Sequence, residues 1–450
     1  MYMKGPQPLT SRRSGPLSGT ARVPGDKSMS HRALMLAGLA QEETIIAGLL
    51  EGEDVINTAA AMRALGARIG AGDDGLWRVH GTGEKHLKAP DHVLDMGNSG
   101  TSTRLLAGLV AAHPVTATFT GDASLVKRPM KRIMEPLTLM GARFECRDGG
   151  LLPMTVHGTG QAKNIEYRLP VASAQVKSAI LLAALNTHGI TTVIEATPTR
   201  DHTENMLRHF GVPVSVETLA DGAQAIRIDG PHVLRGCSVD VPADPSSAAF
   251  PVVAAVLAEG SDIRLPGVGI NDRRIGLYTT LREMGAEIVF ENFRAQGGEK
   301  TADIIVRGIG ALRGIAVPPG RVPGMIDEFP VLAVAAACAQ GVTKMSGLAE
   351  LRVKESDRLK MMADGLAACG VKLEMGEDSL TVYGSGQPPH GGVMIETALD
   401  HRIAMSFLVL GTVTDEPVSV DDASPVATSF PGFADLMNGL GADITVIGRL

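Results

Sequence analysis

The chain has 450 residues, of which 44% are hydrophobic and 20% charged, a composition typical of globular proteins and a length sufficient for two domains. Its formal net charge of −7 argues against general binding to nucleic acids or anionic membrane surfaces, because neither would be attracted at long range. Aromatic residues make up only 3% of the chain, so it has no evident stacking platform for single-stranded nucleic acid. Any anion site must therefore be local.

Two further features of the sequence bear on where in the cell the protein is found. The segment from Met1 to Ser18 contains basic residues but no apolar run, and the longest apolar runs, such as residues 331–339, are too short to span a bilayer. The cysteines share no CxxC spacing, and we expect all four to be reduced residues of the core: Cys146, Cys237, Cys338 and Cys369. These features predict a cytoplasmic protein that is neither exported nor embedded in a membrane.

One pattern occurs six times along the chain: an apolar helix ends at a glycine, and a short β-type run follows. The glycines are Gly66, Gly141, Gly211, Gly285, Gly370 and Gly441. The intervals between consecutive members are nearly equal, a regularity that chance does not explain. Glycine supplies the left-handed conformation that ends a helix and turns the chain into a strand. The pattern predicts an α/β protein built from six copies of one unit.

The second copy shows the unit in detail. A helix is expected to start at residues 95–98 and to continue to Val110, and the alternating run 115–119 predicts a strand. A second helix is expected to end at Gly141, with a strand at residues 142–146. Each unit is thus interpreted as helix, strand, helix, strand.

A polar or charged turn opens the first helix of each unit. These turns are residues 25–28, 97–100, 173–175, 244–247, 326–328 and 400–402. The N-terminus of a helix carries unpaired N–H groups and the positive end of the helix dipole. We therefore expect anionic ligands to bind at these helix starts.

The chain also divides into two similar halves. The segments that begin at Val23 and Val241 match each other and lie about half a chain apart. We expect one discontinuous domain of residues 1–23 plus 243–450 and a second of residues 24–242, each with three units. The short N-terminal strand would pack with the later half. The chain would then cross twice between the domains, with a hinge and the substrate cleft between them.

Cations recur at equivalent places in the units: Lys27, Arg32, Lys127, Arg128, Arg200, Arg273, Arg274, Lys354, Arg358 and Arg402. Any one of them alone is typical of a solvated surface residue, but their recurrence favours convergence on ligands with several negative groups. Carboxylates stand beside cations at Asp327-Glu328 and Lys354-Glu355. This pattern suits proton transfer, although helix caps and surface ion pairs give the same pattern.

Other chemistries lack their motifs. The chain has no GxGxxG after a strand, no GxxxxGK[ST] and no GxSxG. Its histidines have no metal-ligand spacing, so we expect neither a metal nor a cofactor. The turn Asn98-Ser99-Gly100-Thr101 fits either an anion site or a simple helix cap.

Six ordered segments carry a resemblance to a known family: residues 24–28, 121–130, 173–178, 200–204, 351–358 and 400–405. Together they resemble the 5-enolpyruvylshikimate-3-phosphate synthase branch of the enolpyruvyl transferases, in its divergent bacterial class (class II). The resemblance covers about residues 17–447. It implies two domains of three βαβαββ repeats each, the enolpyruvyl-transferase-like inverse α/β barrel. It also implies a cytoplasmic monomer without metal that transfers the enolpyruvyl group of phosphoenolpyruvate to the 5-hydroxyl of shikimate 3-phosphate, in aromatic amino acid biosynthesis.

The resemblance implies roles for residues that match the family motifs. The shikimate 3-phosphate contacts are Lys27, Ser28, Arg32, Ser173, Ala174, Gln175, Arg200, Asp327 and Lys354. The phosphoenolpyruvate contacts are Lys27, Gly100, Arg128, Gln175, Arg358 and Arg402. The proton-transfer residues are Asp327, Glu355 and Lys27. In the family chemistry, protonation of the enol carbon and addition of the hydroxyl give a tetrahedral intermediate that loses phosphate.

The chain departs from the family pattern at one position. Many members have Lys just before Thr-Ser-Phe-Pro, whereas this chain has Ala427. Some herbicide-insensitive members of the divergent class carry Ala where this chain has Gly100. Because Gly100 lacks the methyl group that would crowd the inhibitor, we expect glyphosate to compete with phosphoenolpyruvate.

Two alternatives remain open at this point. A sister transferase acts on UDP-N-acetylglucosamine with the same six-unit architecture, but it typically has a reactive Cys in a loop that corresponds to residues 121–130, where this chain has none. A binding protein without catalytic activity would not need Asp327, Glu355 and Lys27 together. The sequence therefore favours the shikimate enzyme.

Overall fold

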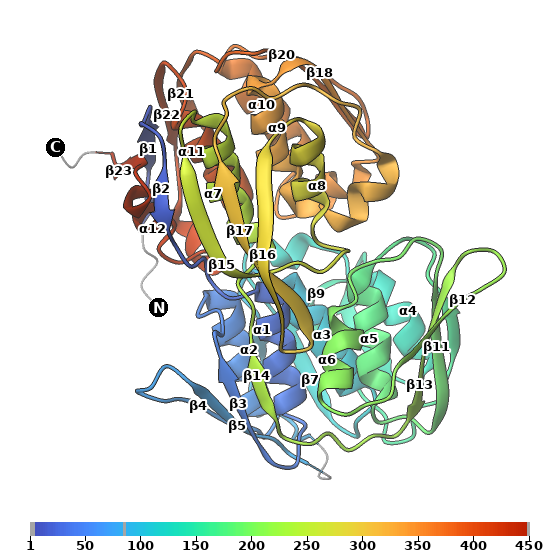
Figure 1. Ribbon diagram of the computed structural model, residues 1–450. Coiled ribbons are helices and arrows are strands. Elements are labelled where there is room, and N and C mark those ends of the chain that lie inside the picture. Colours follow the sequence, from blue (N-terminus) through green and yellow to red (C-terminus); the bar gives the residue numbers. More distant parts are fainter. Residues whose placement is uncertain (1–4, 84–86, 448–450) are drawn as a thin grey trace. The chain divides into compact units, whose positions relative to one another are not determined.

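The computed structural model describes residues 5–83 and 87–447, and the chain divides into two compact units. Unit 1 consists of Met1–Asp26, Ala243–Arg294 and Lys300–Leu450, and unit 2 of Lys27–Pro242 and Ala295–Glu299 (Figure 1). The chain leaves unit 1 after Asp26 rather than at residue 23, because Gly25 bridges Ala243 and Asp26 pairs with Arg274. The segment Ala295–Glu299, which no sequence pattern set apart, groups with unit 2.

The described part of unit 2 contains three four-stranded sheets and six α-helices. The helices are α1 (Lys27–Ala37), α2 (Glu53–Ala64), α3 (Gly100–Ala111), α4 (Lys131–Leu139), α5 (Ala174–Ala184) and α6 (His202–His209). The sheets have the orders β14 (Ser238–Asp240)-β3 (Glu43–Ala47)-β5 (Trp77–His80)-β4 (Arg68–Ala71), β6 (Leu94–Asp95)-β7 (Thr116–Thr120)-β9 (Leu151–His157)-β8 (Arg143–Arg147) and β10 (Glu166–Arg168)-β11 (Gly189–Glu195)-β13 (Gln224–Gly230)-β12 (Ser215–Thr218). In each sheet the first pair is parallel and the other pairs are antiparallel.

The described part of unit 1 repeats this plan. Its α-helices are α7 (Pro245–Leu257), α8 (Gly276–Glu283), α9 (Phe329–Cys338), α10 (Arg358–Ala368), α11 (His401–Gly411) and α12 (Phe433–Gly439). Its sheets have the orders β2 (Ser18–Thr20)-β15 (Asp262–Gly269)-β17 (Glu299–Arg307)-β16 (Glu287–Gln296), β18 (Gln340–Ser346)-β20 (Ser379–Ser385)-β19 (Lys372–Met375) and β21 (Gly391–Ile395)-β22 (Glu416–Val420)-β1 (Leu9–Arg12)-β23 (Asp443–Val446). In the second sheet, parallel bridges at Arg313 and Ala316 stand where the first strand lies in the others.

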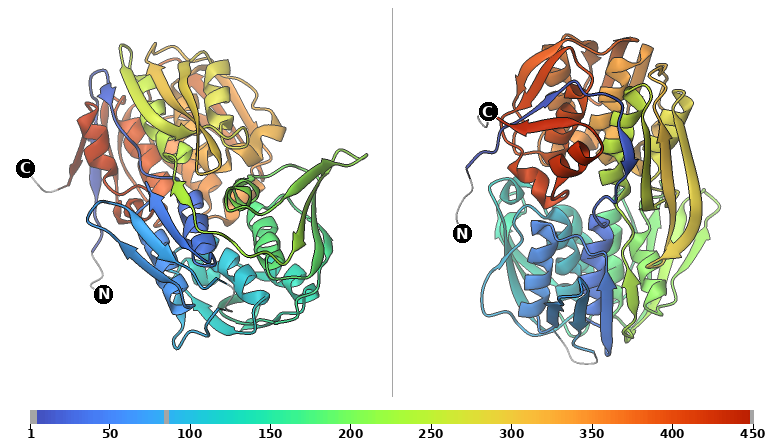
Figure 2. Two further views of the ribbon diagram at one scale, coloured as in Figure 1. Left: turned by 60° about the horizontal axis from the view of Figure 1, so that its bottom comes forward. Right: turned by 60° about the vertical axis from the view of Figure 1, so that its left-hand side comes forward.

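The predicted α/β fold with six repeated units is confirmed, but the helix–strand–helix–strand interpretation of each unit is incomplete. In the second unit, β6 precedes α3 and β9 follows β8, so the unit is βαβαββ. The first strand was missed because it contains only Leu94 and Asp95. In the last sheet the N-terminal strand β1 pairs with β22 and β23, as the blue strand beside the red ones in Figure 2 shows.

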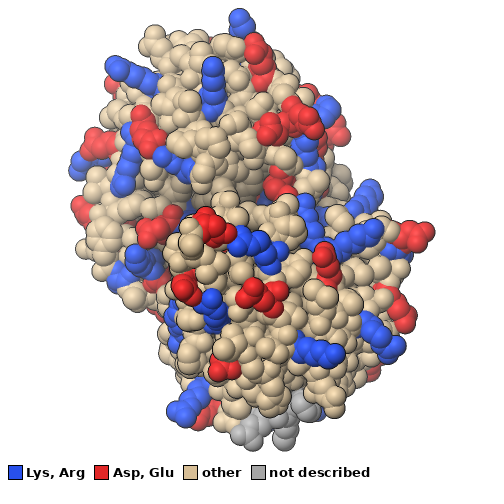
Figure 3. All heavy atoms as spheres, turned by 90° about the vertical axis from the view of Figure 1, so that its right-hand side faces the viewer, with Lys and Arg blue, Asp and Glu red and all other residues tan. Residues whose placement is uncertain are grey.

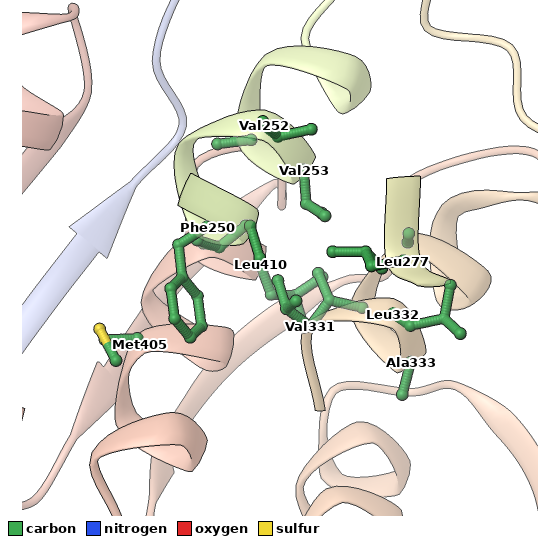
Figure 4. Close-up of a cluster of buried hydrophobic side chains, with 14 of the residues drawn as sticks. Phe250, Val252, Val253, Leu277, Val331, Leu332, Ala333, Met405 and Leu410 are labelled. Carbon is green, nitrogen blue, oxygen red and sulfur yellow. The ribbon is translucent and has the colours of Figure 1, made fainter. Parts of the chain in front are cut away.

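The first helix of each unit lies in the core. All ten residues of α9 are buried, as expected for a helix that is apolar on every side. In unit 1, α7, α9 and α11 contact one another. Figure 4 shows side chains of this core from α7, α8, α9 and α11, among them Phe250, Leu277, Val331, Met405 and Leu410.

The glycines that define the repeat behave as predicted. All six have positive φ, between 85° and 113°. After α2, Gly66 N–H donates to the carbonyl of Arg63 and Ala67 N–H to that of Met62, and the same two bonds recur after α4, α6, α8, α10 and α12. This pair of bonds is the Schellman motif, in which the residue at the glycine position adopts the left-handed conformation.

The four cysteines are free, but not all lie in the core. Cys338 and Cys369 are buried, and burial raises the pKa of their thiols to about 12 and 11. Cys237 is partly buried, whereas Cys146 is exposed. The expectation of a core position for Cys146 is wrong because it lies on β8, which is an edge strand with mostly exposed residues.

Charged side chains of both signs are interspersed on the face drawn in Figure 3. This distribution agrees with the small net charge of the chain. Within the described residues, every helix is too short or too polar to cross a lipid bilayer.

Candidate active site

Lys27 is the first residue of α1, in unit 2. Its ammonium group forms an ion pair with Asp54 of α2, a carboxylate whose side chain is only 3% exposed. The Lys27 side chain itself is 22% exposed. The buried carboxylate therefore holds a partly exposed cation at the start of a helix, where anions are favoured. Ser28 follows it and is partly buried.

Arg32, one turn later on α1, is buried. Its Nε donates to Thr203 Oγ1 at 2.7 Å and its Nη2 to Ser178 Oγ at 2.8 Å. Its Nη1 donates to the carbonyl of Ser28 at 3.0 Å. These bonds tie α1 to α5 and α6, so the structure gives Arg32 a clear role in joining the helices that carry the other predicted residues.

Arg128 is held by the turn before α3. Its Nη2 donates to Asn98 Oδ1 at 2.6 Å and to Ser124 Oγ at 3.0 Å, and its Nη1 to the Asn98 carbonyl at 3.3 Å. Asn98 in turn donates to Asp122, whose carboxylate also accepts from the backbone of the loop that contains Ser124. The loop and the turn are thus one hydrogen-bonded assembly that sets the position of the Arg128 guanidinium.

Gly100 and Gln175 lie around a further arginine, Arg104. Arg104 Nη1 donates to Gln175 Oε1 at 2.8 Å, and Gln175 Nε2 donates to Thr101 Oγ1 at 3.0 Å. A Cβ atom added at Gly100 would lie 2.7 Å from Arg104 Nη1 and 3.5 Å from Arg128 Nη1. The first turn of α3 therefore brings two arginines and an amide together.

Sequence reasoning missed Arg104, and it singled out the segments that contain Asn98 and Asp122 without predicting that these two residues contact each other. The available signal for Arg104 was its spacing, because residues four apart on a helix lie on the same face, and Arg104 follows Gly100 by four positions. No comparable signal existed for the contact between Asn98 and Asp122, because it joins two separate loops.

The start of α5 and the loop before α6 supply the other predicted positions in this half of the chain. Ser173 caps α5 by accepting from the Val176 N–H at 3.4 Å, and Ala174 is the first helical residue. Arg200 immediately precedes Asp201, the N-cap position of α6, and is partly buried.

A buried lysine anchors the loop that carries Arg200. Lys177 Nζ lies 3.0 Å from Glu195 Oε1 and 2.8 Å from Glu204 Oε1, and all three side chains are at most 2% exposed. The other oxygen of Glu195 accepts from Thr199 Oγ1 at 2.7 Å. This cluster connects α5, the end of β11 and α6 beside Arg200.

In unit 1, the guanidinium of Arg358 contacts three carboxylates, among them the predicted site residues Asp327 and Glu355. Arg358, the first residue of α10, contacts Asp327 at 3.1 Å, Glu355 at 2.5 Å and Asp400 at 2.8 Å. Lys354 Nζ lies 3.3 Å from the same oxygen of Asp327. The predicted pairing of carboxylates with cations is therefore present here, with Asp327 between two cations.

In this network, burial and the neighbouring charges have opposite effects on the pKa values of Arg358 and Asp400. Burial alone would lower the pKa of Arg358, but Asp400, Glu355 and Asp327 raise it above its usual value. Burial would raise the pKa of Asp400, yet Arg358 brings it below its usual value. Arg358 and Asp400 are therefore an ionised buried pair.

Arg402 lies one helix away on α11. Its backbone N–H donates to Asp400, the N-cap residue of α11, at 2.9 Å. Its side chain is 12% exposed, and its Nη1 lies 3.6 Å from Glu328 Oε1. Ala427, where many family members have Lys, is exposed on a short 3-10 helix, Ser424–Thr428.

The two sets differ in chemistry. Unit 2 presents mainly cations and donors at helix starts, which suit the binding of anionic groups. The described residues of unit 1 place Asp327 and Glu355, which are 15% and 20% exposed, next to Lys354 and Arg358. Carboxylates that are ordered by cations and still reach solvent can exchange protons with a substrate.

The comparisons with known proteins agree on one family. A family model described as EPSP synthase (3-phosphoshikimate 1-carboxyvinyltransferase) matches residues 11–437. A protein of Paramagnetospirillum magneticum named 3-phosphoshikimate 1-carboxyvinyltransferase is 61% identical over 439 residues, which are 98% of each chain. A protein of the same name from Rhodospirillum rubrum is 58% identical, over 98% of this chain and 99% of that one.

Solved structures give the same result. The chain is similar to the EPSP synthase of Acinetobacter baumannii with a TM-score of 0.85 and 46% identity, over 98% of this chain and 100% of that one. The enolpyruvyl transferase NikO of Streptomyces tendae is similar with a TM-score of 0.76 at 19% identity, over 98% of this chain and 99% of that one. The latter likeness bears on the fold alone.

Proposed function

We propose, since this chain belongs to the EPSP synthase (3-phosphoshikimate 1-carboxyvinyltransferase) family, that it transfers the enolpyruvyl group of phosphoenolpyruvate to the 5-hydroxyl of shikimate 3-phosphate and releases phosphate. This reaction belongs to the shikimate pathway of aromatic amino acid biosynthesis. The observation that carries the proposal is the unit 1 network, in which Asp327 lies between Lys354 and Arg358, and Arg358 also binds Glu355.

The reaction needs two opposed proton transfers. In the addition step, the enol carbon of phosphoenolpyruvate gains a proton, the 5-hydroxyl oxygen bonds to C2, and the hydroxyl proton goes to a base. In the elimination step, the methyl carbon returns a proton and the C2–phosphate oxygen bond breaks. We assign these transfers to Asp327, Glu355 and Lys27, because carboxylates and an amine can each give and take a proton.

The remaining residues bind the two substrates in this proposal. Shikimate 3-phosphate contacts Lys27, Ser28, Arg32, Ser173, Ala174, Gln175, Arg200, Asp327 and Lys354. Phosphoenolpyruvate contacts Lys27, Gly100, Arg128, Gln175, Arg358 and Arg402. Arginine suits both, since its planar guanidinium binds phosphate and carboxylate with two parallel hydrogen bonds.

The first experiment measures phosphate release from the purified protein with phosphoenolpyruvate, using shikimate 3-phosphate and UDP-N-acetylglucosamine as parallel acceptors. We expect release only with shikimate 3-phosphate. Release only with the nucleotide sugar would move the protein to the sister activity, and release with neither would favour a binding protein.

A second experiment tests the role of Glu355. Glu355→Gln keeps the size of the side chain and removes the carboxylate, so we expect turnover to fall roughly 100-fold or more, as for loss of a general acid–base group. Binding of shikimate 3-phosphate by calorimetry should stay within two-fold of wild type. Turnover near the wild-type rate would contradict the assignment.

The location and the oligomeric state are part of this proposal. We propose a cytoplasmic monomer, and the four free cysteines suit a reducing compartment. Light scattering after size-exclusion chromatography, with the mass of one chain as the expected result, tests the second point.

A further inference from the structure

Glu328 is a buried carboxylate that the reaction described above does not use. It is the last residue of a short 3-10 helix, Ile326–Glu328, next to Asp327, and is 2% exposed. Its Oε1 accepts a hydrogen bond from Ser246 Oγ on α7 and lies 3.6 Å from Arg402 Nη1. Its Oε2 has no hydrogen-bond partner among the described residues. A buried carboxylate that is only partly satisfied is costly to keep.

The position of Glu328 is set by its hydrogen bond from Ser246, which is itself bound by Arg274. Arg274 Nη2 donates to Ser246 Oγ at 2.9 Å, so the single hydroxyl proton of Ser246 is left for Glu328. Arg274 is itself held by Asp26 at 3.0 Å and Asp244 at 3.2 Å. The carboxylate is therefore drawn toward Ser246 and kept beyond hydrogen-bond distance of Arg402.

Glu328 interacts with Arg402 through its charge but does not form a hydrogen bond with it. Arg402 Nη1 has no hydrogen-bond partner in the described part of the chain, although the negative charge of Glu328 lies 3.6 Å away. The carboxylate thus offsets the charge of Arg402 without using its donor. An anion at Arg402 can therefore accept a hydrogen bond from Nη1, but the negative charge of Glu328 repels it. Such repulsion is strong where water is largely excluded.

We propose that Glu328 is a charge-balancing residue that weakens the hold of Arg402 on anions, so that phosphoenolpyruvate and phosphate exchange rapidly. The proposal rests on the proposed function, which assigns Arg402 to phosphoenolpyruvate. Tighter ground-state binding alone does not raise the rate of the chemical step, and slow release of phosphate would limit turnover. Glu328 therefore favours turnover over affinity.

The central test is Glu328→Gln, which keeps the shape and an oxygen that can accept from Ser246 but removes the charge. We expect the KM for phosphoenolpyruvate and the inhibition constant of inorganic phosphate to fall at least five-fold, with a lower kcat. The KM for shikimate 3-phosphate should stay within two-fold. An unchanged or higher KM for phosphoenolpyruvate in a folded variant would overturn the proposal.

For a second variant, Ser246→Ala, we expect the KM for phosphoenolpyruvate to change in the opposite direction. Without the hydroxyl, Glu328 is free to move toward Arg402 and hydrogen-bond it, so we expect the KM for phosphoenolpyruvate to rise at least two-fold. A merely structural role would raise this KM in both variants and would refute charge balancing. Ser346→Ala, the same change at an exposed position of β18, is the control and should behave as wild type.

A measurement of phosphate binding tests the role of Glu328 independently of the proposed reaction. Equilibrium dialysis with labelled inorganic phosphate needs no turnover, and we expect Glu328→Gln to bind phosphate at least five-fold more tightly than wild type. If wild type shows no activity with shikimate 3-phosphate, the proposed function fails while this comparison still stands. Equal phosphate affinity in the two proteins would overturn the role of Glu328.

Discussion

At the residue scale, the carboxylates around Arg358 are distinguished by their access to solvent. The side chain of Asp400 is 0% exposed, whereas those of Asp327 and Glu355 are 15% and 20% exposed. A fully buried carboxylate that is bound to a buried guanidinium cannot readily exchange protons with a substrate. Asp400 therefore orients Arg358 and caps α11, and the two partly exposed carboxylates are the ones to which we propose to assign proton transfer together with Lys27.

The Arg358–Asp400 pair predicts a loss of stability in acid. The folded pKa of Asp400 lies below its usual value, so the stability it contributes is present above about pH 4 and is lost as the pH falls through the folded pKa. Asp400→Asn should therefore lose less unfolding free energy than wild type between pH 7 and pH 3. It should also be less stable at pH 7 by about 1–3 kcal/mol, because Arg358 loses a charged partner.

Urea unfolding of both proteins at several pH values measures this difference. Parallel curves for wild type and Asp400→Asn would show that Asp400 is not the group that takes up the proton.

Gly100→Ala should change the binding of inhibitor and substrate without affecting the fold. The new methyl group would lie 2.7 Å from Arg104 Nη1, so the flexible arginine must shift from Gln175. We expect the inhibition constant of glyphosate, measured against phosphoenolpyruvate, to rise roughly ten-fold or more, since small displacements in an active site have large effects. An unchanged constant would contradict the expected crowding, and thermal unfolding, unchanged within a few degrees, is the control.

The sequence indicated individual site residues where the interacting groups are close together along the chain. Lys354, Glu355 and Arg358 could be grouped from the sequence because Glu355 stands next to Lys354 and three positions before Arg358. Asp327 has no cation near it in the sequence, and its role was implied by the family resemblance alone. Arg104 was not singled out, and the role of Glu328 could not be predicted, because both depend on contacts with α5 and α7 that exist only after folding.

At the scale of elements, the repeat was readable because each second helix ends in the same way. The apolar helix and its glycine lie within a few residues of each other, so the Schellman motif is encoded locally. The strands were harder to predict, since β6 has only two residues. The N-terminal strand is an exception, because it was expected to pack with the later half and β1 does pair with β22 and β23.

Two exposed glycines allow a direct test of the helix ends. Gly370 has φ +89° and Gly439 is the last residue of α12, and neither has an atom within 4 Å of an added Cβ. Gly370→Ala should lower the unfolding free energy by about 1–2 kcal/mol, because alanine is disfavoured in the left-handed region. Gly439→Ala, the matched control, should leave stability unchanged or raise it by up to about 1 kcal/mol. Equal effects in urea unfolding would show that the left-handed conformation is not what Gly370 provides.

At the scale of the whole molecule, unit 1 is built from both ends of the chain. Strand β1 pairs with β22 and β23, β2 pairs with β15, and Gly25 bridges Ala243. The paired segments at Val23 and Val241 indicated this arrangement because the duplication is visible in the sequence. The boundary near Asp26 was not visible, since it is set by a tertiary ion pair with Arg274.

Arg274 is the residue that joins these segments. It is 3% exposed and contacts Asp26 in the N-terminal segment and Asp244 at the start of α7. Burial alone would lower the pKa of Arg274, but Asp26, Asp244 and Glu328 raise it, so the group is charged. It is thus the shared counter-charge of two buried carboxylates.

Arg274→Met should therefore be strongly destabilising. Methionine fills most of the volume but leaves Asp26 and Asp244 buried without their cation, and removing one partner of a buried ion pair costs about 3–5 kcal/mol. Arg13→Met is the matched control on the same N-terminal segment, because Arg13 pairs with Asp415 at the surface, where the two side chains are 62% and 66% exposed. This control should lose at most about 1 kcal/mol in urea unfolding. If both variants lost equally little, the N-terminal segment would be held by its strand pairing alone, without help from Arg274.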